Sequence, residues 1–118
     1  ALPGIARADK AQRRAASVGF DWPDAPPVLE KIEEEVGELA AALGGGEAGG
    51  AVHHEIGDVL FSVVNLCRHV AVDPELALRA ATDRFMDRFR IVERLAGDQL
   101  STMTLDELDA LWNQAKGR

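Results

Sequence analysis

The stretches KIEEEVGEL at Lys31–Leu39 and HHEIGDVLFSVVNLCRH at His53–His69 decide the fold of this chain. In both, apolar residues recur every three to four positions, which is the period of an amphipathic helix. Between them lie three glycines at 44–46 and two more at 49–50. Glycines in this number end helices and loosen loops. The two stretches therefore predict two antiparallel helices joined by a flexible loop.

The rest of the chain carries further helix signals. The dipeptide Asp73-Pro74 has the residue types of a helix cap and first position, and Thr104 followed by Glu107 is a capping-box pattern. A turn-rich break covers residues 19–24. No segment shows the sustained alternation of a strand. We expect an all-α protein, an antiparallel bundle of four to five helices within one domain, 1–118, with helices near residues 5–18, 26–43, 51–70, 74–95 and 105–116.

Composition limits the classes of partner. The 118 residues are 47% hydrophobic, with a net charge of -7. Because an acidic surface repels a phosphate backbone, duplex nucleic acid is an unfavourable partner. No apolar run reaches the ~20 residues that span a bilayer, so we expect no membrane insertion. With the single cysteine Cys67 no intrachain disulfide forms, and no signal-peptide pattern stands at the N-terminus, so we expect a cytoplasmic location.

A helical wheel separates an apolar from an acidic side on the helix near 26–43. Lys31, Glu35 and Glu38 share one flank of the apolar side, whereas Glu34 points nearly opposite the core stripe. We therefore expect Glu35 and Glu38 close to the buried side. The predicted core stripe of this helix is Leu29, Ile32, Val36, Leu39 and Leu43.

The helix near 51–70 is apolar around most of its circumference, so we expect it to be buried on several sides. Its predicted main stripe is Val52, Ile56, Val59, Leu60, Val63, Cys67 and Val70. One polar strip interrupts this pattern, consisting of Glu55, Asp58, Ser62, Asn65 and His69. Because unpaired buried carboxylates are costly, the strip needs partners.

Two pairs of acidic residues at i, i+3 spacing thus lie on consecutive antiparallel helices. The pairs are Glu35/Glu38 and Glu55/Asp58. Four convergent carboxylates repel one another unless a cation neutralises them, and all-oxygen ligands favour Mg²⁺, or Mn²⁺ as a substitute, over zinc. The alternative is that these residues form the solvated faces of an acidic protein. A di-iron centre and a P-loop are disfavoured, because the Glu-x-x-His pairs and the Gly-Lys-Ser/Thr sequence are missing.

The chain resembles the MazG family of nucleoside triphosphate pyrophosphohydrolases, in the all-α NTP pyrophosphatase group. The family pattern is E-E-x-x-E, then 12–28 residues, then E-x-x-D. Here Glu34, Glu35 and Glu38 match the first part, and Glu55 and Asp58 the second. The similarity extends over nearly the whole chain and is strongest to the C-terminal domain of two-domain MazG proteins. We therefore expect either an excised domain or a stand-alone homologue.

The resemblance implies site residues, carried over position by position. The metal ligands are Glu35, Glu38, Glu55 and Asp58, and the general base is Glu34 or Glu38. Either Trp112 or Trp22 is expected to stack on the nucleobase of the substrate, and the alternative role of both is packing. For Arg84 and Arg88 the alternative is ion pairing with Asp83 or Asp87. The implied substrate-binding residues are Lys31, Asn65, Arg84, Arg88, Trp112 and Lys116.

The implied reaction is hydrolysis of a nucleoside triphosphate to a monophosphate and pyrophosphate with Mg²⁺, at broad or house-cleaning specificity. Two alternatives stay open: an enzyme of the same group restricted to dUTP or dCTP, and a non-catalytic nucleotide-binding or dimerisation domain. We also expect a homodimer, because a short chain with wide apolar helix faces needs more cover than one copy supplies, and because the family assembles this way.

Overall fold

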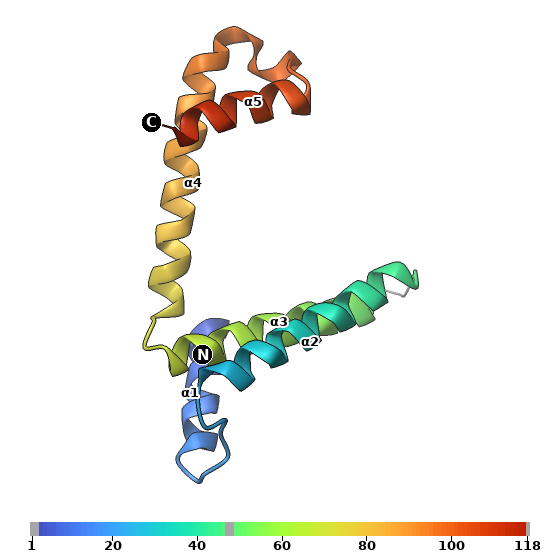
Figure 1. Ribbon diagram of the computed structural model, residues 1–118, viewed down its shortest axis with the longest axis vertical. Helices are drawn as coiled ribbons and strands as arrows, with labels where there is room; N and C mark the ends of the chain where they lie inside the picture. The colour runs from blue at the N-terminus through green and yellow to red at the C-terminus, as the bar shows by residue number, and fades with distance from the viewer. Residues whose placement is uncertain (1–2, 47–48, 118) are drawn as a thin grey trace. The chain divides into compact units, whose positions relative to one another are not determined.

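A computed structural model describes residues 3–46 and 49–117 of the chain. Residues 47 and 48 of the predicted glycine-rich loop lie outside the described residues. The described residues form α-helices, one 3₁₀ helix and turns, so the predicted all-α class is confirmed (Figure 1). The elements are α1 (Gly4–Ala16), α2 (Ala25–Gly44), α3 (Gly49–His69), α4 (Pro74–Ala96), η1 (Gly97–Thr102) and α5 (Leu105–Lys116).

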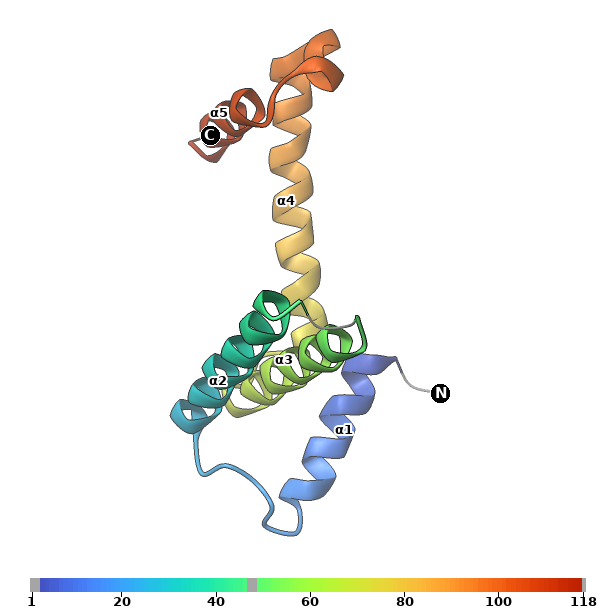
Figure 2. The same cartoon turned by 90° about the vertical axis from the view of Figure 1, so that its right-hand side faces the viewer.

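The structure divides into two compact units, one up to Glu75 and the other from Leu76. In the first unit, α2 and α3 lie side by side as the predicted antiparallel pair, and α1 packs against α3 (Figures 1 and 2). The side chain of Gln12 fastens α1 to α3, because its Nε2 donates to the Phe61 carbonyl over 2.9 Å.

The helix caps follow the sequence signals. Asp73 accepts from the Glu75 backbone N–H over 2.9 Å at the start of α4. At the start of α5, Thr104 and Glu107 exchange both capping-box hydrogen bonds. The 3₁₀ helix between α4 and α5 was not predicted, since its sequence, GDQLST, shows no apolar period.

The predicted core stripe of α2 is wrong by one position. In α2 the buried residues are Val28, Glu35 and Ala42, whereas Leu29, Val36 and Leu43, each one position further on, are exposed. Ile32 and Leu39 are half-buried, because they lie at the border between the buried and the exposed side of α2. One position turns a helix by about 100°, so α2 meets α3 with the side that carries Glu35. This rotation places an acidic side chain in the helix–helix contact.

The expectation for α3 needs the same correction. Within the described chain α3 is not buried on several sides, because Ile56, Leu60 and Val63 of the predicted stripe are exposed. Ser62 of the polar strip is buried, and the strip's other members are partly buried: Glu55, Asp58, Asn65 and His69. The polar strip is therefore the side that α3 turns toward its neighbours in the first unit.

In the second unit α5 returns against α4. Trp112 on α5 contacts Phe85, with ring centroids 5.3 Å apart, and Val92 and Ala115 are buried. The Arg88 guanidinium lies over the Trp112 ring, 5.8 Å from its centroid. A cation over an indole face is an attractive arrangement, so this contact helps to hold the two helices.

Candidate metal centre

The acidic residues predicted as metal ligands gather on the facing sides of α2 and α3. On α2, oxygens of Glu34, Glu35 and Glu38 lie within 4.8 Å of one another, and on α3 the same limit holds for ligand atoms of Glu55, Asp58 and His54. Each helix alone thus offers three ligand atoms in one place. All four predicted ligands belong to these two groups.

Lys31 anchors the acidic group on α2. Its ammonium lies 2.9 Å from Glu35 Oε1 and 3.4 Å from Glu34 Oε1. The Lys31 hydrogen bond holds the pKa of Glu35 below its ordinary value, and the nearby His54 contributes in the same direction. The Lys31 pKa is raised in return, first by its hydrogen bond to Glu35. Glu35 is therefore kept as a carboxylate although it is only 5% exposed.

Glu38 behaves in the opposite way. Its pKa is raised above the ordinary value, most of all by the negative charge of Glu35 and further by burial and by Glu55 on the facing helix. This is the expected result of several carboxylates competing for one region without a cation. The influence of Glu55 on Glu38, and of His54 on Glu35, shows that the groups on α2 and α3 sense one another's charge.

Two of the predicted ligands carry oxygens with no partner. Glu35 Oε2 and Glu55 Oε2 are buried, and neither accepts a hydrogen bond within the described part of the chain. Leaving a charged oxygen buried and unpaired is costly, so such atoms call for an explanation. A divalent cation that prefers oxygen ligands fits both atoms and also relieves the repulsion at Glu38.

The sequence interpretation assigned no role to two histidines that lie beside carboxylates, one at the candidate metal centre and one away from it. His54 Nε2 lies 3.2 Å from Asp58 Oδ2, so it sits beside a predicted ligand. His69 Nε2 lies 3.0 Å from Asp21 Oδ1, at the far end of α3. The i, i+4 spacing of His54 and Asp58 was a signal for the first pair. The second joins positions 48 residues apart, which spacing does not reveal.

The remaining predicted site residues fall into both units. Asn65 lies in the first unit, where its Oδ1 accepts from Arg68 Nη2 over 2.7 Å. Arg84, Arg88, Trp112 and Lys116 lie in the second unit, and of these Arg88 and Trp112 contact each other. Asp87, considered as an ion-pair partner for Arg84 or Arg88, pairs with Arg90 instead, over 3.0 Å.

Fold and site together define a class of protein: an all-α chain whose central helix pair presents two carboxylate groups suited to a divalent cation. Comparison with known proteins narrows this class. The model of the MazG nucleotide pyrophosphohydrolase domain matches residues 27–93, which include all four predicted ligands. The chain belongs to the MazG family.

Two relatives illustrate the extent of the similarity. The nucleoside triphosphate pyrophosphohydrolase/pyrophosphatase MazG of Thermotoga maritima is 44% identical over 98% of this chain, and the nucleoside triphosphate pyrophosphohydrolase of Escherichia coli K12 is 40% identical over the same share. The protein YabN of Bacillus subtilis is 43% identical over 52% of the chain. The chain spans 45% of the length of the first two relatives.

Among the described residues, no helix combines the length and apolar character needed to cross a membrane.

Proposed function

We propose that this chain hydrolyses nucleoside triphosphates to nucleoside monophosphates and pyrophosphate, with Mg²⁺ held by Glu35, Glu38, Glu55 and Asp58. The observation that carries the proposal is the pair of buried, unpartnered carboxylate oxygens on Glu35 and Glu55. Membership of the MazG family, and the names of the Thermotoga and Escherichia relatives, support the choice of reaction.

The cation accounts for how an acidic protein accepts an acidic substrate. When bound, Mg²⁺ would neutralise charge on the phosphoryl oxygens and make a coordinated water more acidic. The chain itself supplies the remaining parts. Glu38 or Glu34 takes a proton from the attacking water. Mn²⁺ is the proposed substitute, since it also prefers oxygen ligands.

Cationic side chains are proposed to bind the phosphates. Lys31 already stands among the carboxylates of α2. Arg84, Arg88 and Lys116 are the proposed further cations, because guanidinium and ammonium groups bind phosphate oxygens strongly. Trp112 and Asn65 are the proposed contacts to the nucleoside. We also propose that the chain is one functional domain, 1–118, because the similarity to the Thermotoga relative extends over 98% of it.

The test replaces the ligands one at a time. Glu38→Ala and Asp58→Ala should each lower Mg²⁺-dependent pyrophosphate release by at least about a hundredfold, because even partners that only orient metal ligands contribute 10–100-fold. Glu30→Ala, an exposed acidic residue on the same helix α2, is the matched control and should retain full activity. Activity of either ligand variant within about threefold of wild type would contradict the assignment.

A panel of nucleotide substrates separates the proposed function from two alternatives. An enzyme restricted to dUTP or dCTP should release pyrophosphate from those nucleotides alone. A non-catalytic nucleotide-binding domain should bind nucleotides and release nothing. The proposed reaction is established if several nucleotides yield monophosphate plus pyrophosphate and if EDTA stops the release of these products.

A homodimer is the proposed assembly. The sequence assigns several apolar side chains to the core of the neighbouring helices α2 and α3, but this chain leaves them exposed, and exposed apolar side chains favour cover by a partner. These side chains are Leu29, Val36 and Leu43 on α2 and Ile56, Leu60 and Val63 on α3. A second copy of the chain carries the same surface and so offers a complementary apolar partner.

A further inference from the structure

His54 stands at the candidate metal centre but outside the acidic pattern that supplies the four proposed ligands. It directly precedes Glu55, the first residue of the E-x-x-D sequence. The His54 side chain is 72% exposed, so packing in a core does not account for a histidine at this position. Its imidazole adds one nitrogen to a group of carboxylate oxygens.

The ring nitrogen lies at the spacing of a neighbouring metal ligand. His54 and Asp58 are one helical turn apart on α3, and His54 Nε2 is 3.2 Å from Asp58 Oδ2. Ligand atoms of these two residues and of Glu55 all lie within 4.8 Å of one another. In an octahedral site with bonds of about 2.1 Å, adjacent ligand atoms are about 3 Å apart and opposite ones about 4.2 Å. The three side chains therefore stand close to the separations that ligands of one cation adopt.

Two buried oxygens call for a cation next to this nitrogen. Glu55 Oε2 has no partner in the described part of the chain, and the same holds for Glu35 Oε2 on the facing helix α2. The Glu35 side chain is only 7% exposed. The positive charge of His54 helps to lower the pKa of Glu35, so the two side chains lie near each other across the helix pair. A cation that binds these oxygens is therefore within reach of His54 Nε2.

A hydrogen bond from His54 to Asp58 is the other use of a 3.2 Å contact. It would serve one oxygen of Asp58 but leave the buried oxygens of Glu35 and Glu55 without partners. Buried carboxylate oxygens without partners are costly. Coordination of one cation accounts for all three carboxylates, whereas the hydrogen bond accounts for one.

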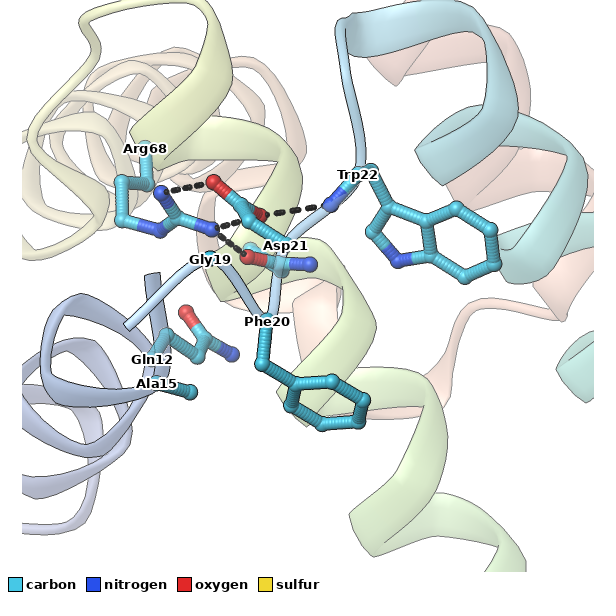
Figure 3. A pocket seen from close by; sticks show the side chains of 8 residues that line it. Gln12, Ala15, Gly19, Phe20, Asp21, Trp22 and Arg68 are labelled. Carbon is cyan, nitrogen blue, oxygen red and sulfur yellow. Dashed lines mark hydrogen bonds and ion pairs between the residues drawn. The ribbon is translucent and has the colours of Figure 1, made fainter. Parts of the chain in front are cut away.

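The other contact between a histidine and a carboxylate, at the far end of α3, shows the difference. There His69 Nε2 lies 3.0 Å from Asp21 Oδ1. Arg68 donates through Nη1 and Nη2 to both oxygens of Asp21, so the charge of this carboxylate is already neutralised (Figure 3). Asp58 has no lysine or arginine partner among the described residues. The contact between His54 and Asp58 therefore lacks the fixed cation that the contact at Asp21 has.

We propose that His54 is a fifth ligand of the metal centre and binds the cation through Nε2, beside Glu35, Glu55 and Asp58. The inference rests on the proposed function, which places the cation at these carboxylates. An imidazole nitrogen suits transition ions such as Ni²⁺, whereas Mg²⁺ prefers oxygen ligands. His54 therefore shifts the preference of this centre toward transition ions, relative to a centre built from the four carboxylates alone.

Titration calorimetry on the intact chain, without a histidine tag, measures this preference through the affinities for Ni²⁺ and Mg²⁺. His54→Ala should weaken Ni²⁺ binding by at least about tenfold, because even partners that only orient metal ligands contribute roughly 10–100-fold. Mg²⁺ binding should stay within about threefold, because Mg²⁺ usually keeps several waters and one more water replaces the imidazole. His53→Ala, which replaces the exposed histidine directly before His54, is the matched control and should change neither affinity.

A spectroscopic measurement tests the coordination itself. Mn²⁺ bound to the wild-type chain should show, in pulsed electron paramagnetic resonance, the modulation caused by a directly bound nitrogen. The signal should persist in His53→Ala and disappear in His54→Ala. A wild type without this modulation, or a modulation that survives in His54→Ala, would overturn the proposal. Equal losses of Ni²⁺ and Mg²⁺ affinity in His54→Ala would do the same.

Both measurements need no substrate, so they separate this inference from the proposed function. If the nitrogen modulation depends on His54 but no nucleotide is hydrolysed, the proposed reaction fails and the ligand assignment holds. If nucleotides are hydrolysed with Mg²⁺ but no nitrogen binds the metal, the ligand assignment fails and the proposed function holds.

Discussion

Glu35 combines two properties that oppose each other, because its carboxylate is both charged and buried. It is buried, it is paired with Lys31 through one oxygen, and its second oxygen has no partner within the described chain. Its charge is also the main reason for the raised pKa of Glu38. One ion pair cannot satisfy a carboxylate that both stays ionised and repels its neighbours, so the site is suited to a second cation.

Replacing Glu35 by glutamine should therefore remove metal binding while keeping the side-chain volume. We expect Mg²⁺ to raise the melting temperature of the wild type, because a ligand that binds only the folded state stabilises it. This increase should vanish in Glu35→Gln and persist in Glu33→Gln, an exposed neighbour on α2. Differential scanning fluorimetry with and without Mg²⁺ measures both. An undiminished shift in Glu35→Gln would exclude this residue as a ligand.

Asp21 connects the turn before α2 to the end of α3. Its carboxylate accepts from Arg68 and lies 3.0 Å from His69, and these contacts, with Arg68 the largest, place its pKa well below the ordinary value. A lowered folded-state pKa means that the carboxylate stabilises the fold above its ordinary pKa, near 4. This contribution is lost as the pH falls further, because the unfolded chain then binds the proton first.

The pH dependence of unfolding should reveal this contribution. Between about pH 5 and pH 3 the free energy of unfolding of the wild type should decrease more than that of Asp21→Asn, which has no carboxylate to protonate at this position. Urea titrations at both pH values give the comparison. Asp24→Asn, exposed in the same turn, is the matched control and should follow the wild type. Parallel curves for wild type and Asp21→Asn would show that the pair is not coupled to folding.

At the scale of elements, α1 and α3 end in the same way with different residues. In each, a residue just past the helix has positive φ, and the next N–H bonds back five residues: Phe20 to Ala15 after Gly19, and Val72 to Cys67 after Ala71. This is the Schellman ending, which favours glycine at the positive-φ position because a Cβ is strained there. Ala71 therefore carries a strain that Gly19 does not.

Exchanging these residues should change stability in opposite directions. Gly19→Ala should lower the free energy of unfolding by about 1 kcal/mol, since no atom lies within 4 Å of the added Cβ and the backbone conformation alone opposes it. Ala71→Gly should raise it by somewhat less, because glycine also adds freedom to the unfolded chain. Denaturant unfolding of both variants tests the pair. A loss of stability in Ala71→Gly would contradict the assigned strain.

At the scale of the whole molecule, the exposed apolar face of α2 and α3 is the main feature that one chain leaves open. Leu60 is 61% exposed in the middle of α3, although the period of the sequence assigns it to a core. Burial of such a side chain stabilises by about 1.5–3 kcal/mol, so a partner that covers the whole face gains substantially.

The proposed dimer should be visible in solution and sensitive to Leu60. Light scattering at micromolar concentration should give twice the mass of the chain, and Leu60→Lys should give the monomer mass, because it places a charge in an apolar contact. Leu105→Lys, which replaces a leucine of α5 that is 80% exposed, is the control and should remain dimeric. A monomeric wild type would refute the prediction.

The sequence by itself determined the helices, their caps and the acidic residues that share a side of α2 and α3. These depend on local spacing: a helix brings residues three and four apart together whatever else surrounds it. The Asp73 and Thr104 caps and the grouping of Glu35 with Glu38 were predictable for this reason. The roles of these carboxylates remain predictions that the variants above address.

Only the tertiary structure decided which side of each helix is buried and which distant residues meet. Periodicity shows that Leu29 and Val36 are apolar and aligned, but α2 turns the neighbouring side, with Glu35, toward α3. Gln12 meets Phe61, and Asp21 meets Arg68, across 49 and 47 residues. Such pairs depend on how α1, the turn and α3 pack, and packing is a property of several elements together that no local pattern encodes.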